Sequence, residues 1–218
     1  MHGKIIVVEG LDGCGKSTQV DLLKTHFPDC RFLTFPNYDS PSGEIITEYL
    51  QGRIPETDSQ RSAYASGIFY SMDRYISYRK DWYLDCKNQK PIISARYVTS
   101  NLIYQTAKLP REEWEDYIKW LSDFEYSKLG IPVPDAVIFL DVPIEISQRL
   151  LSERYENTDQ KKDIHEADLE YFQRCHDVAE YLITREHWKR LPCCSGDTMR
   201  SVDSIQADLV KLIRETLE

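Results

Sequence analysis

The feature that most constrains the fold is an apolar run near the start of the chain that leads into a glycine-rich loop. Residues 5–8 are an unbroken β-branched run, typical of a strand buried on both faces of a parallel sheet. Gly10, Gly15, Lys16 and Ser17 then match the pattern G-x-x-x-x-G-K-[ST], and an apolar pattern of helical period follows. Strand, loop and helix in this order predict a phosphate-binding loop. An ordinary glycine turn between strand and helix is the alternative.

The chemistry of phosphate binding explains these residue types. Glycines let backbone N–H groups turn toward phosphate oxygens beside the positive end of a helix. Lys16 is expected to reach the β- and γ-phosphates of a nucleotide, and the hydroxyl of Ser17 is expected to ligate Mg²⁺. The residues expected to bind the nucleotide cofactor are Gly10, Asp12, Gly13, Cys14, Gly15, Lys16, Ser17 and Thr18.

Further along the chain, short apolar runs alternate with helical patterns. The predicted strands after the first lie at 31–35, 91–94, 134–141 and 188–193. The predicted helices lie at 19–27, 44–50, 62–82, 98–108, 112–129, 144–155, 163–184 and 202–217. This alternation indicates a three-layer α/β fold, in which helices flank a parallel sheet of about five strands. Without a repeat or a linker, we expect one domain over 1–218, with ligands at the carboxyl ends of the strands.

The composition of the chain argues against two classes of binding partner, nucleic acids and membranes. The chain has 36 acidic and 27 basic side chains and a net charge of −9, which argues against a nucleic-acid-binding surface. The apolar stretches are too short to span a bilayer, and no signal-type segment opens the chain. The six cysteines lack C-x-x-C spacing, as expected of free thiols. We therefore expect a cytoplasmic protein that does not bind membranes.

The phosphate loop alone does not name a reaction. A GTPase would need a guanine-reading N-K-x-D motif, and the chain has none. Instead, aromatic and arginine residues follow the predicted strands, and a charged segment lies at about 149–163. These features favour a small kinase with a second, specific pocket and a lid over that segment.

At this point the chain resembles the thymidylate kinase family over nearly its whole length. The resemblance rests on the run from Glu9 to Thr18, on Phe35-Pro36-Asn37-Tyr38, on Tyr70-Ser71-Met72-Asp73-Arg74, on Arg96-Tyr97-Val98-Thr99-Ser100-Asn101 with Tyr104, and on Leu140-Asp141-Val142-Pro143. The glycine loop is shared by many proteins, whereas the ordered combination is far more specific. The resemblance implies a phosphate-loop nucleoside monophosphate kinase that transfers the γ-phosphoryl group of MgATP to dTMP, and a homodimer.

The resemblance also implies roles for residues on the nucleoside side of the pocket. Asp12 matches the carboxylate that accepts from the sugar 3′-OH, and a turn-favouring aspartate is the alternative. Tyr70 matches the aromatic residue on which thymine stacks, and Arg74 matches the arginine that binds a thymine carbonyl. Their i, i+4 spacing places both on one helix face. The alternative is a core tyrosine beside an arginine that is salt-bridged to a neighbour.

Three more matches concern the phosphate, the base and the sugar. Arg96 matches the arginine that holds the dTMP phosphate, a task suited to a bidentate and permanently charged guanidinium. Asn101 resembles the amide that pairs with the thymine edge, and Tyr104 resembles the residue that crowds the sugar 2′ position. The residues expected to line the opposite wall, unless they only pack a loop, are Phe35, Pro36 and Tyr38.

The remaining catalytic group is expected in the lid. Some thymidylate kinases carry an arginine in the phosphate loop where this chain has Gly13, and others take it from the lid. Arg149 and Arg154 are therefore the catalytic candidates beside Lys16 and Arg96. A second role open to Arg149 is to stack on the adenine of ATP. For Arg149 and Arg154 alike, the alternative to a catalytic role is a place on a solvated, charged helix end.

Two departures from the family pattern bear on function. Ala95 stands where most of the family has the aspartate before the phosphate-binding arginine, which bears on Mg²⁺ binding and on the turnover rate; Glu9, Asp12 or a water are the alternatives that could substitute for it. Tyr38 stands where several relatives have a phosphate-gripping arginine. The choice between dTMP and the close pyrimidine dUMP stays open. Two rival functions remain: another deoxynucleotide or nucleoside kinase on the same scaffold, and a nucleotide-binding regulatory protein without catalysis.

Overall fold

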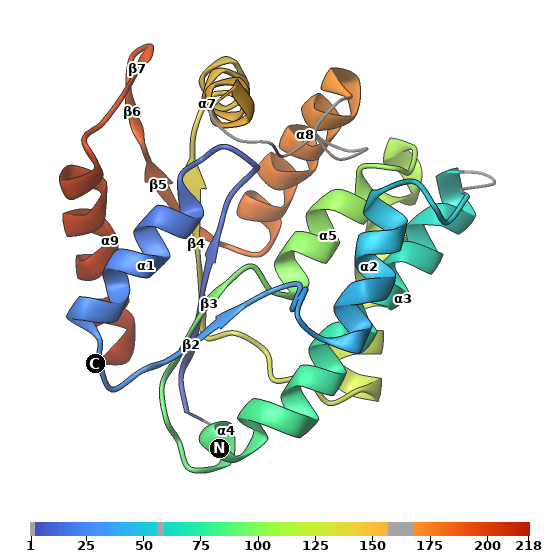
Figure 1. Ribbon diagram of the computed structural model, residues 1–218, viewed down its shortest axis with the longest axis horizontal. Helices are drawn as coiled ribbons and strands as arrows, with labels where there is room; N and C mark the ends of the chain where they lie inside the picture. The colour runs from blue at the N-terminus through green and yellow to red at the C-terminus, as the bar shows by residue number, and fades with distance from the viewer. Residues whose placement is uncertain (1–2, 56–58, 157–167) are drawn as a thin grey trace.

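The structure, a computed structural model, describes residues 3–55, 59–156 and 168–218 (Figure 1). Within these residues, five parallel strands form one sheet in the order β2-β3-β1-β4-β5. The strands are β1 (Ile5–Glu9), β2 (Arg31–Thr34), β3 (Ile92–Ala95), β4 (Ala136–Asp141) and β5 (Lys189–Pro192). Each lies where an apolar run predicted a strand, so the predicted five-stranded parallel sheet is confirmed.

Helices cover both faces of this sheet (Figure 1). The helices α1 (Lys16–His26) and α9 (Val202–Leu217) pack together on one face. The helices α5 (Val98–Thr106) and α8 (Leu169–Arg185) pack together on the other. Beyond α5 lie α3 (Ser59–Ser77) and then α2 (Pro41–Leu50), and α7 (Ile144–Glu156) follows β4. The predicted arrangement of helices around a central sheet is confirmed.

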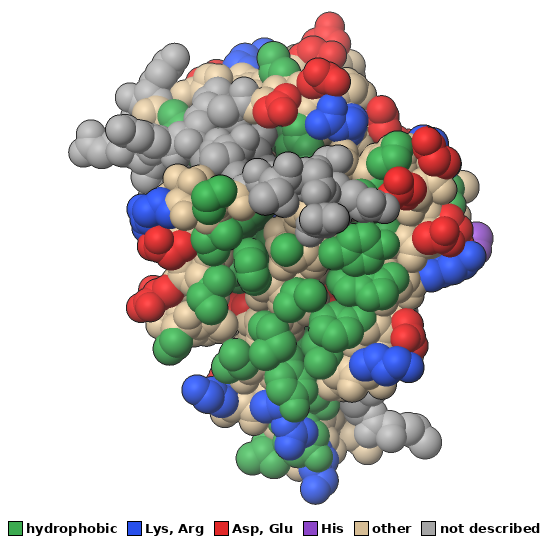
Figure 2. Space-filling view, turned by 90° about the vertical axis from the view of Figure 1, so that its right-hand side faces the viewer, with side chains coloured by type: hydrophobic (Ala, Val, Ile, Leu, Met, Phe, Trp, Pro, Cys, Tyr) green, Lys and Arg blue, Asp and Glu red, His purple; other side chains and the backbone are tan. Residues whose placement is uncertain are grey.

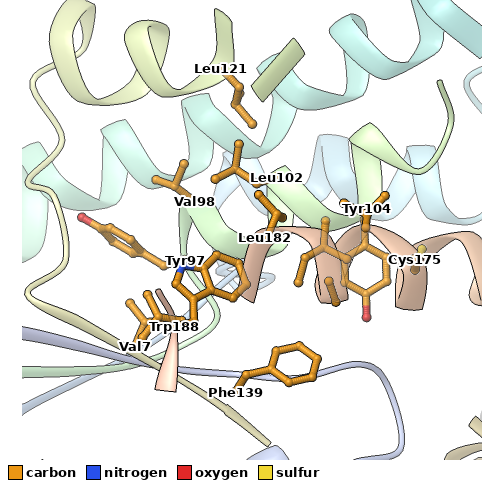
Figure 3. Close-up of a cluster of buried hydrophobic side chains, with 14 of the residues drawn as sticks. Val7, Tyr97, Val98, Leu102, Tyr104, Leu121, Phe139, Cys175, Leu182 and Trp188 are labelled. Carbon is orange, nitrogen blue, oxygen red and sulfur yellow. The ribbon is translucent and has the colours of Figure 1, made fainter. Parts of the chain in front are cut away.

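The central strand β1 explains why its sequence is apolar without a break. Ile5 and Val7 join the larger apolar cluster on the α5 and α8 side, whereas Ile6 and Val8 join the cluster beneath α1 and α9. Figure 3 shows part of the larger cluster, with Val7 beside Trp188 and Tyr97, and with Leu102 of α5 and Leu182 of α8 in the same cluster. Alternate side chains therefore enter different cores, and both faces of the strand exclude water.

Two predicted helices are interrupted by π-helical turns. The helix expected over 62–82 is α3 followed by a π-helical turn, η1 (Tyr78–Trp82), and then by α4 (Tyr83–Lys87). The helix expected over 112–129 is a short turn, η2 (Arg111–Glu113), then α6 (Trp114–Ser122) and a second π-helical turn, η3 (Asp123–Lys128). A π-helical turn holds an extra residue, which shifts the side chains that face inward. Trp82 and Glu125 are both fully buried in these turns.

Smaller differences concern element ends. The helix α2 starts at Pro41 rather than 44, because Ser40 caps it through an Oγ that accepts from the N–H of Gly43 at 3.1 Å. A hairpin of two short strands, β6 (Cys194–Ser195) and β7 (Thr198–Met199), follows β5 and was not predicted. The predicted polar segment at 157–162 and the start of the helix expected at 163 lie outside the described residues.

Candidate active site

The predicted phosphate loop forms the turn from β1 to α1, at the carboxyl edge of the sheet (Figure 1). Gly10, Gly13 and Gly15 have positive φ angles of 154°, 82° and 81°. Ser17 and Thr18 are exposed in the first turn of α1, beyond the loop. The loop therefore presents backbone N–H groups and hydroxyls at the positive end of a helix, as phosphate binding requires.

The side chain of Lys16 is folded over this loop. Its Nζ donates to the carbonyl oxygen of Gly10 at 2.7 Å and lies 3.4 Å from that of Leu11. The same Nζ lies 3.5 Å from Sγ of Cys14, which is buried. The ammonium group thus sits against the loop backbone, and a bound phosphate would offer it a stronger, charged acceptor.

Three predicted residues meet where the phosphate loop approaches the end of β3. Arg96 directly follows that strand, and its Nη2 pairs with Oδ1 of Asp12 in the loop. The hydroxyl of Tyr104 on α5 donates to Oδ2 of the same carboxylate at 2.8 Å. The guanidinium of Arg96 also lies over the ring of Tyr104, 5.3 Å from its centre. The loop, β3 and α5 are therefore joined by one charged cluster.

The backbone of Arg96 is held in an unusual conformation. Its φ angle is 64°, in the left-handed region that arginine rarely adopts. Its N–H donates to the carbonyl oxygen of Val8 at 3.2 Å, and its own carbonyl accepts from Oγ of Ser94 at 2.6 Å. Such strain persists only where the surroundings fix it, and it gathers at functional sites.

The charge of Arg96 is secured by its neighbours. Burial disfavours the charged form, but Asp12, Tyr104 and Glu9 outweigh it and raise the pKa of Arg96 well above its usual value. Burial and the charge of Asp12 likewise raise the pKa of Tyr104, so its hydroxyl keeps its proton. Arg96 is thus a permanent cation beside the loop, as the binding of a phosphate group requires.

Glu9 is a fully buried carboxylate at the end of β1, the strand that pairs with β3, where Ala95 stands. Ala95 is buried at the end of β3, paired in register with Val8. Glu9 accepts from the hydroxyls of Thr99 at 2.6 Å and Ser100 at 2.7 Å, in the first turn of α5. Because Glu9 is fully buried, Asp12 is the more accessible of the two carboxylates.

Arg74 lies inside the protein rather than at an open surface. Its Nε and Nη2 donate to Oε2 and Oε1 of Glu125 at 2.7 and 2.6 Å, and both side chains are almost completely buried. This ion pair is the alternative that the sequence left open for Arg74. Asn101 donates to the same carboxylate at 3.0 Å. Tyr70, one helical turn before Arg74, is half-buried and meets the ring of Tyr49 edge-on.

Glu125 was missed by the sequence analysis, although the sequence carries a signal for it. It lies four residues after Leu121 and four before Leu129, on the apolar stripe of the helix predicted over 112–129. A charged residue on such a stripe requires a buried partner of opposite charge. Arg74 is that partner, and only the tertiary structure brings the two together.

The loop predicted to form the opposite wall is held by another missed residue. Asp73 is buried on α3 and accepts from the N–H of Asn37 at 2.9 Å and from Oγ of Ser42 at 2.8 Å. Phe35 is buried against Tyr97, whereas Pro36 is half-buried. Tyr38 is 53% exposed at the tip of the loop. Phe35 and Pro36 are therefore the less exposed residues of this loop, and Tyr38 is the more exposed one.

The helix that carries the predicted lid arginines rests directly on the phosphate loop. A Cβ atom at Gly13 would lie 2.4 Å from the carbonyl oxygen of Ser147 and 2.9 Å from Leu151, both on α7. The close packing leaves no room for a side chain at Gly13, which accounts for the absence of a loop arginine. Arg149 is exposed on α7. Burial, and then the charge of Asp141, raise the pKa of the Cys194 thiol, and the charge of Arg149 offsets part of that rise. The side chain of Arg154 and the lid residues 157–163 lie outside the described part.

The described residues contain no cluster of three or more side chains able to enclose a metal ion. Mg²⁺ usually takes only one or two protein ligands and completes its shell with waters and substrate phosphates. The exposed hydroxyl of Ser17 and the partly exposed carboxylate of Asp12 are hard oxygen donors beside the loop, and they fit such a site. None of the described helices is long and apolar enough to cross a membrane.

A phosphate loop between β1 and α1, on a parallel sheet in this order, defines the class of phosphate-loop nucleotide-binding proteins. Solved structures agree with this fold. The thymidylate kinase of Candida albicans superimposes with a TM-score of 0.72 at 22% identity and covers 100% of this chain and 94% of its own. The thymidylate kinase of Ehrlichia chaffeensis does so with a TM-score of 0.66 at 17% identity, covering 98% and 100%.

Sequence comparison identifies the family. The family model described as thymidylate kinase matches residues 8–205. The thymidylate kinase of Mycobacterium tuberculosis is 31% identical over 176 residues, which cover 78% of this chain and 81% of that one. A probable thymidylate kinase of Pyrococcus abyssi is 28% identical over 220 residues, covering 100% and 98%. The chain therefore belongs to the thymidylate kinase family, a family of phosphotransferases, as the sequence motifs predicted.

Proposed function

We propose that this chain transfers the γ-phosphoryl group of MgATP to dTMP, giving ADP and dTDP. One observation carries the proposal: Arg96, the expected ligand of the acceptor phosphate, pairs with Asp12 inside the loop that is expected to hold the donor phosphates. This contact makes the two phosphate sites neighbours. A direct in-line transfer then needs no covalent intermediate, because positioning and charge neutralisation supply the catalysis.

On the donor side, the loop from Gly10 to Thr18 binds the phosphates of ATP. The backbone N–H groups and Lys16 hold the β- and γ-phosphates, and Lys16 leaves the carbonyl oxygen of Gly10 to do so. Ser17, with Asp12 nearby, would hold Mg²⁺. When bound, this ion neutralises charge on the transferring phosphoryl group.

On the acceptor side, Arg96 binds the phosphate of dTMP while Asp12 and Tyr104 meet the sugar. Asp12 accepts from the 3′-OH, and the ring of Tyr104 occupies the space that a 2′-OH would need. The hydrogen bond between Tyr104 and Asp12 fixes the two groups relative to each other. A ribonucleotide is therefore rejected by a rigid pair rather than by a mobile side chain.

Thymine lies between α3, α5 and the loop after β2. Tyr70 stacks on the base, and the buried polar groups Arg74 and Asn101 meet its edge. Phe35 and Pro36 form the facing wall, with Tyr38 at its rim. The apolar walls supply burial, and the few polar groups supply specificity.

The lid over 149–163 completes the site when ATP binds. The helix α7 packs on Gly13 through Ser147 and Leu151, which places the helix that carries Arg149 beside the donor loop. We propose that Arg149 or Arg154 neutralises the transferring phosphoryl group, and that Arg149 alternatively stacks on adenine. Closure of the lid also excludes water, which limits wasteful hydrolysis of ATP.

A homodimer and a cytoplasmic location complete the proposal. Ile68 and Met72 are exposed on one face of α3, and Ile45 is exposed on the neighbouring α2. Figure 2 shows hydrophobic side chains gathered over the face to which α2 and α3 belong. Such an apolar area on two packed helices is suited to contact with a second copy of the chain.

A panel of acceptors tests the proposed reaction. Release of ADP from MgATP is measured with dTMP, dUMP, thymidine, dCMP and dGMP, each over a range of concentrations. We expect strong turnover with dTMP, weaker turnover with dUMP, and little with the others. A preference for thymidine would identify a nucleoside kinase instead. Binding of ATP without turnover on any acceptor would identify a regulatory protein that has lost catalysis.

A further inference from the structure

Glu125 is a fully buried carboxylate at the meeting point of α3, α5 and the π-helical turn η3. Its Oε1 accepts from Oγ of Ser71 at 2.9 Å, from Nη2 of Arg74 at 2.6 Å and from Nδ2 of Asn101 at 3.0 Å. Its Oε2 accepts from Nε of Arg74 at 2.7 Å. One carboxylate thus contacts both polar groups that are expected to meet the base.

These contacts fix which way the amide of Asn101 points. Its Nδ2 faces acceptors: Oε1 of Glu125 at 3.0 Å, the carbonyl oxygen of Gly67 at 3.0 Å and Oγ of Ser71 at 3.4 Å. An amide oxygen in that place would face a carboxylate and a carbonyl and would be repelled. The NH₂ group of Asn101 is therefore locked toward the protein, and its Oδ1 is turned away.

Oδ1 of Asn101 is left as a buried acceptor. Among the described residues it has no hydrogen-bond partner, although the residue is almost completely buried. Buried polar atoms nearly always have a partner, so an orphaned acceptor points to a donor that arrives with a ligand. The imide N3–H of thymine or uracil is such a donor, whereas N3 of cytosine is itself an acceptor.

We propose that Glu125 is a positioning residue that sets the base specificity of the acceptor site. By holding the NH₂ group of Asn101, it leaves Oδ1 as the atom that can accept from the base, which selects pyrimidines with an N3–H and rejects cytosine. The ion pair with Arg74 works in the same direction, because it holds a donor-only group beside the amide. The inference rests on the proposed function, since it takes the base to lie against Asn101.

The test compares Glu125→Gln and Glu125→Asp with the wild-type protein. In Glu125→Gln an amide NH₂ replaces one carboxylate oxygen and no longer forces the orientation of Asn101. In Glu125→Asp the charge opposite Arg74 remains, but the carboxylate is withdrawn from Asn101 by one methylene. Glu115→Gln is the matched control, because Glu115 on α6 also pairs side-on with an arginine, Arg185, away from this cluster.

Binding of dTMP, dUMP, dCMP and N3-methyl-dTMP is measured by calorimetry, with turnover followed in parallel. The wild type and Glu115→Gln should prefer dTMP and dUMP over dCMP and N3-methyl-dTMP. Glu125→Gln should lower the preference for dTMP over dCMP by about tenfold to a hundredfold. A site whose polar group pairs with a substrate group rejects analogues that lack that group, and in this variant the polar group, Oδ1 of Asn101, is no longer held in place. Glu125→Asp should give a smaller loss in the same direction, with dUMP following dTMP.

Three results would overturn the inference. Unchanged selectivity in both variants would show that Glu125 does not orient the amide. An equal loss of affinity for dTMP and dCMP would show a merely structural role. Tight binding of N3-methyl-dTMP by the wild type would show that recognition of the base does not need an N3–H donor. If instead the wild type turned over no dTMP, the proposed function itself would fail, which is a distinct outcome.

Discussion

At the scale of single residues, Gly13 belongs to the glycine-rich loop and also allows α7 to pack closely against that loop. Its φ of 82° lies in the left-handed region, and a Cβ atom there would meet the backbone of Ser147 on α7. Gly15 has nearly the same φ, 81°, but open space around the position of its Cβ. A side chain at Gly15 would therefore cause backbone strain alone, whereas a side chain at Gly13 would cause both backbone strain and a steric clash.

Replacing each glycine by alanine uses this difference. Gly15→Ala should lower the free energy of unfolding by about 1 kcal/mol, the cost of a left-handed non-glycine residue. Gly13→Ala should lower it by about 2–4 kcal/mol, because α7 must also move away from the loop. Urea unfolding without nucleotide measures both changes. Equal losses in the two variants would mean that α7 does not rest on the loop.

Residue-level prediction was best where the function depends on a local pattern. The phosphate loop was recognisable because its residues are contiguous, and Arg96 because an arginine directly follows a strand. Glu125 and Asp73 were missed, because their partners Arg74, Asn37 and Ser42 lie far away in the sequence. Local spacing carries no information about which distant group satisfies a buried charge.

At the scale of elements, the carboxylate of Glu115 on α6 joins that helix to α8. Glu115 accepts from Nε and Nη2 of Arg185 at 3.0 and 2.9 Å and from the hydroxyl of Tyr181 at 2.8 Å. Hydrogen bonds from Arg185, followed by that from Tyr181, lower the pKa of Glu115 from 4.5 to about 2. The folded state therefore favours the ionised carboxylate.

The stability of Glu115→Gln should depend on pH in a defined direction. A lowered pKa stabilises the fold above the ordinary carboxyl pKa of 4.5, and this contribution is lost as the pH falls toward 2. The pair is partly exposed, so we expect the variant to lose only about 0.5 kcal/mol at pH 7. Urea unfolding at pH 7, 5 and 3.5 should show the gap closing. A gap that stays constant over this range would contradict the assignment.

The type of each element was predicted more reliably than the residues at which the element begins and ends. Alternating apolar runs and helical patterns located all five sheet strands. The π-helical turns η1 and η3 were not foreseen, because a helix-period pattern does not show where one extra residue is inserted. The start of α2 was misplaced because the cap and proline, Ser40 and Pro41, resembled a loop.

At the scale of the whole molecule, the sheet order is the step that the sequence did not give. Parallel pairing between β1 and β3, or β4 and β5, joins segments that are far apart in the chain. The alternation of elements predicts such a sheet, but not which strand lies in the centre. The order matters for function, because it places the ends of β1 and β3 side by side, and with them Asp12 and Arg96.

The proposed homodimer makes a prediction about the apolar face of α2 and α3. We expect the wild type to sediment as a dimer, and Ile68→Glu combined with Met72→Glu to sediment as a monomer, because charges would be buried at the interface. Val202→Glu is the control, since Val202 is also exposed but lies on α9, on the other side of the sheet. A monomeric wild type, or a dimer that survives both substitutions, would refute the interface.

The most direct test of the central claim follows the phosphoryl group itself. ATP labelled in its γ-phosphate is incubated with dTMP and the wild type or Arg96→Lys, and the products are separated. The wild type should place the label in dTDP, with little in free phosphate. Arg96→Lys should lower the rate by about a hundredfold or more, because a lysine cannot form the bidentate contact. Two results would contradict the proposed transfer from ATP to dTMP. One is label released mainly as free phosphate, and the other is a transfer rate that Arg96→Lys leaves unchanged.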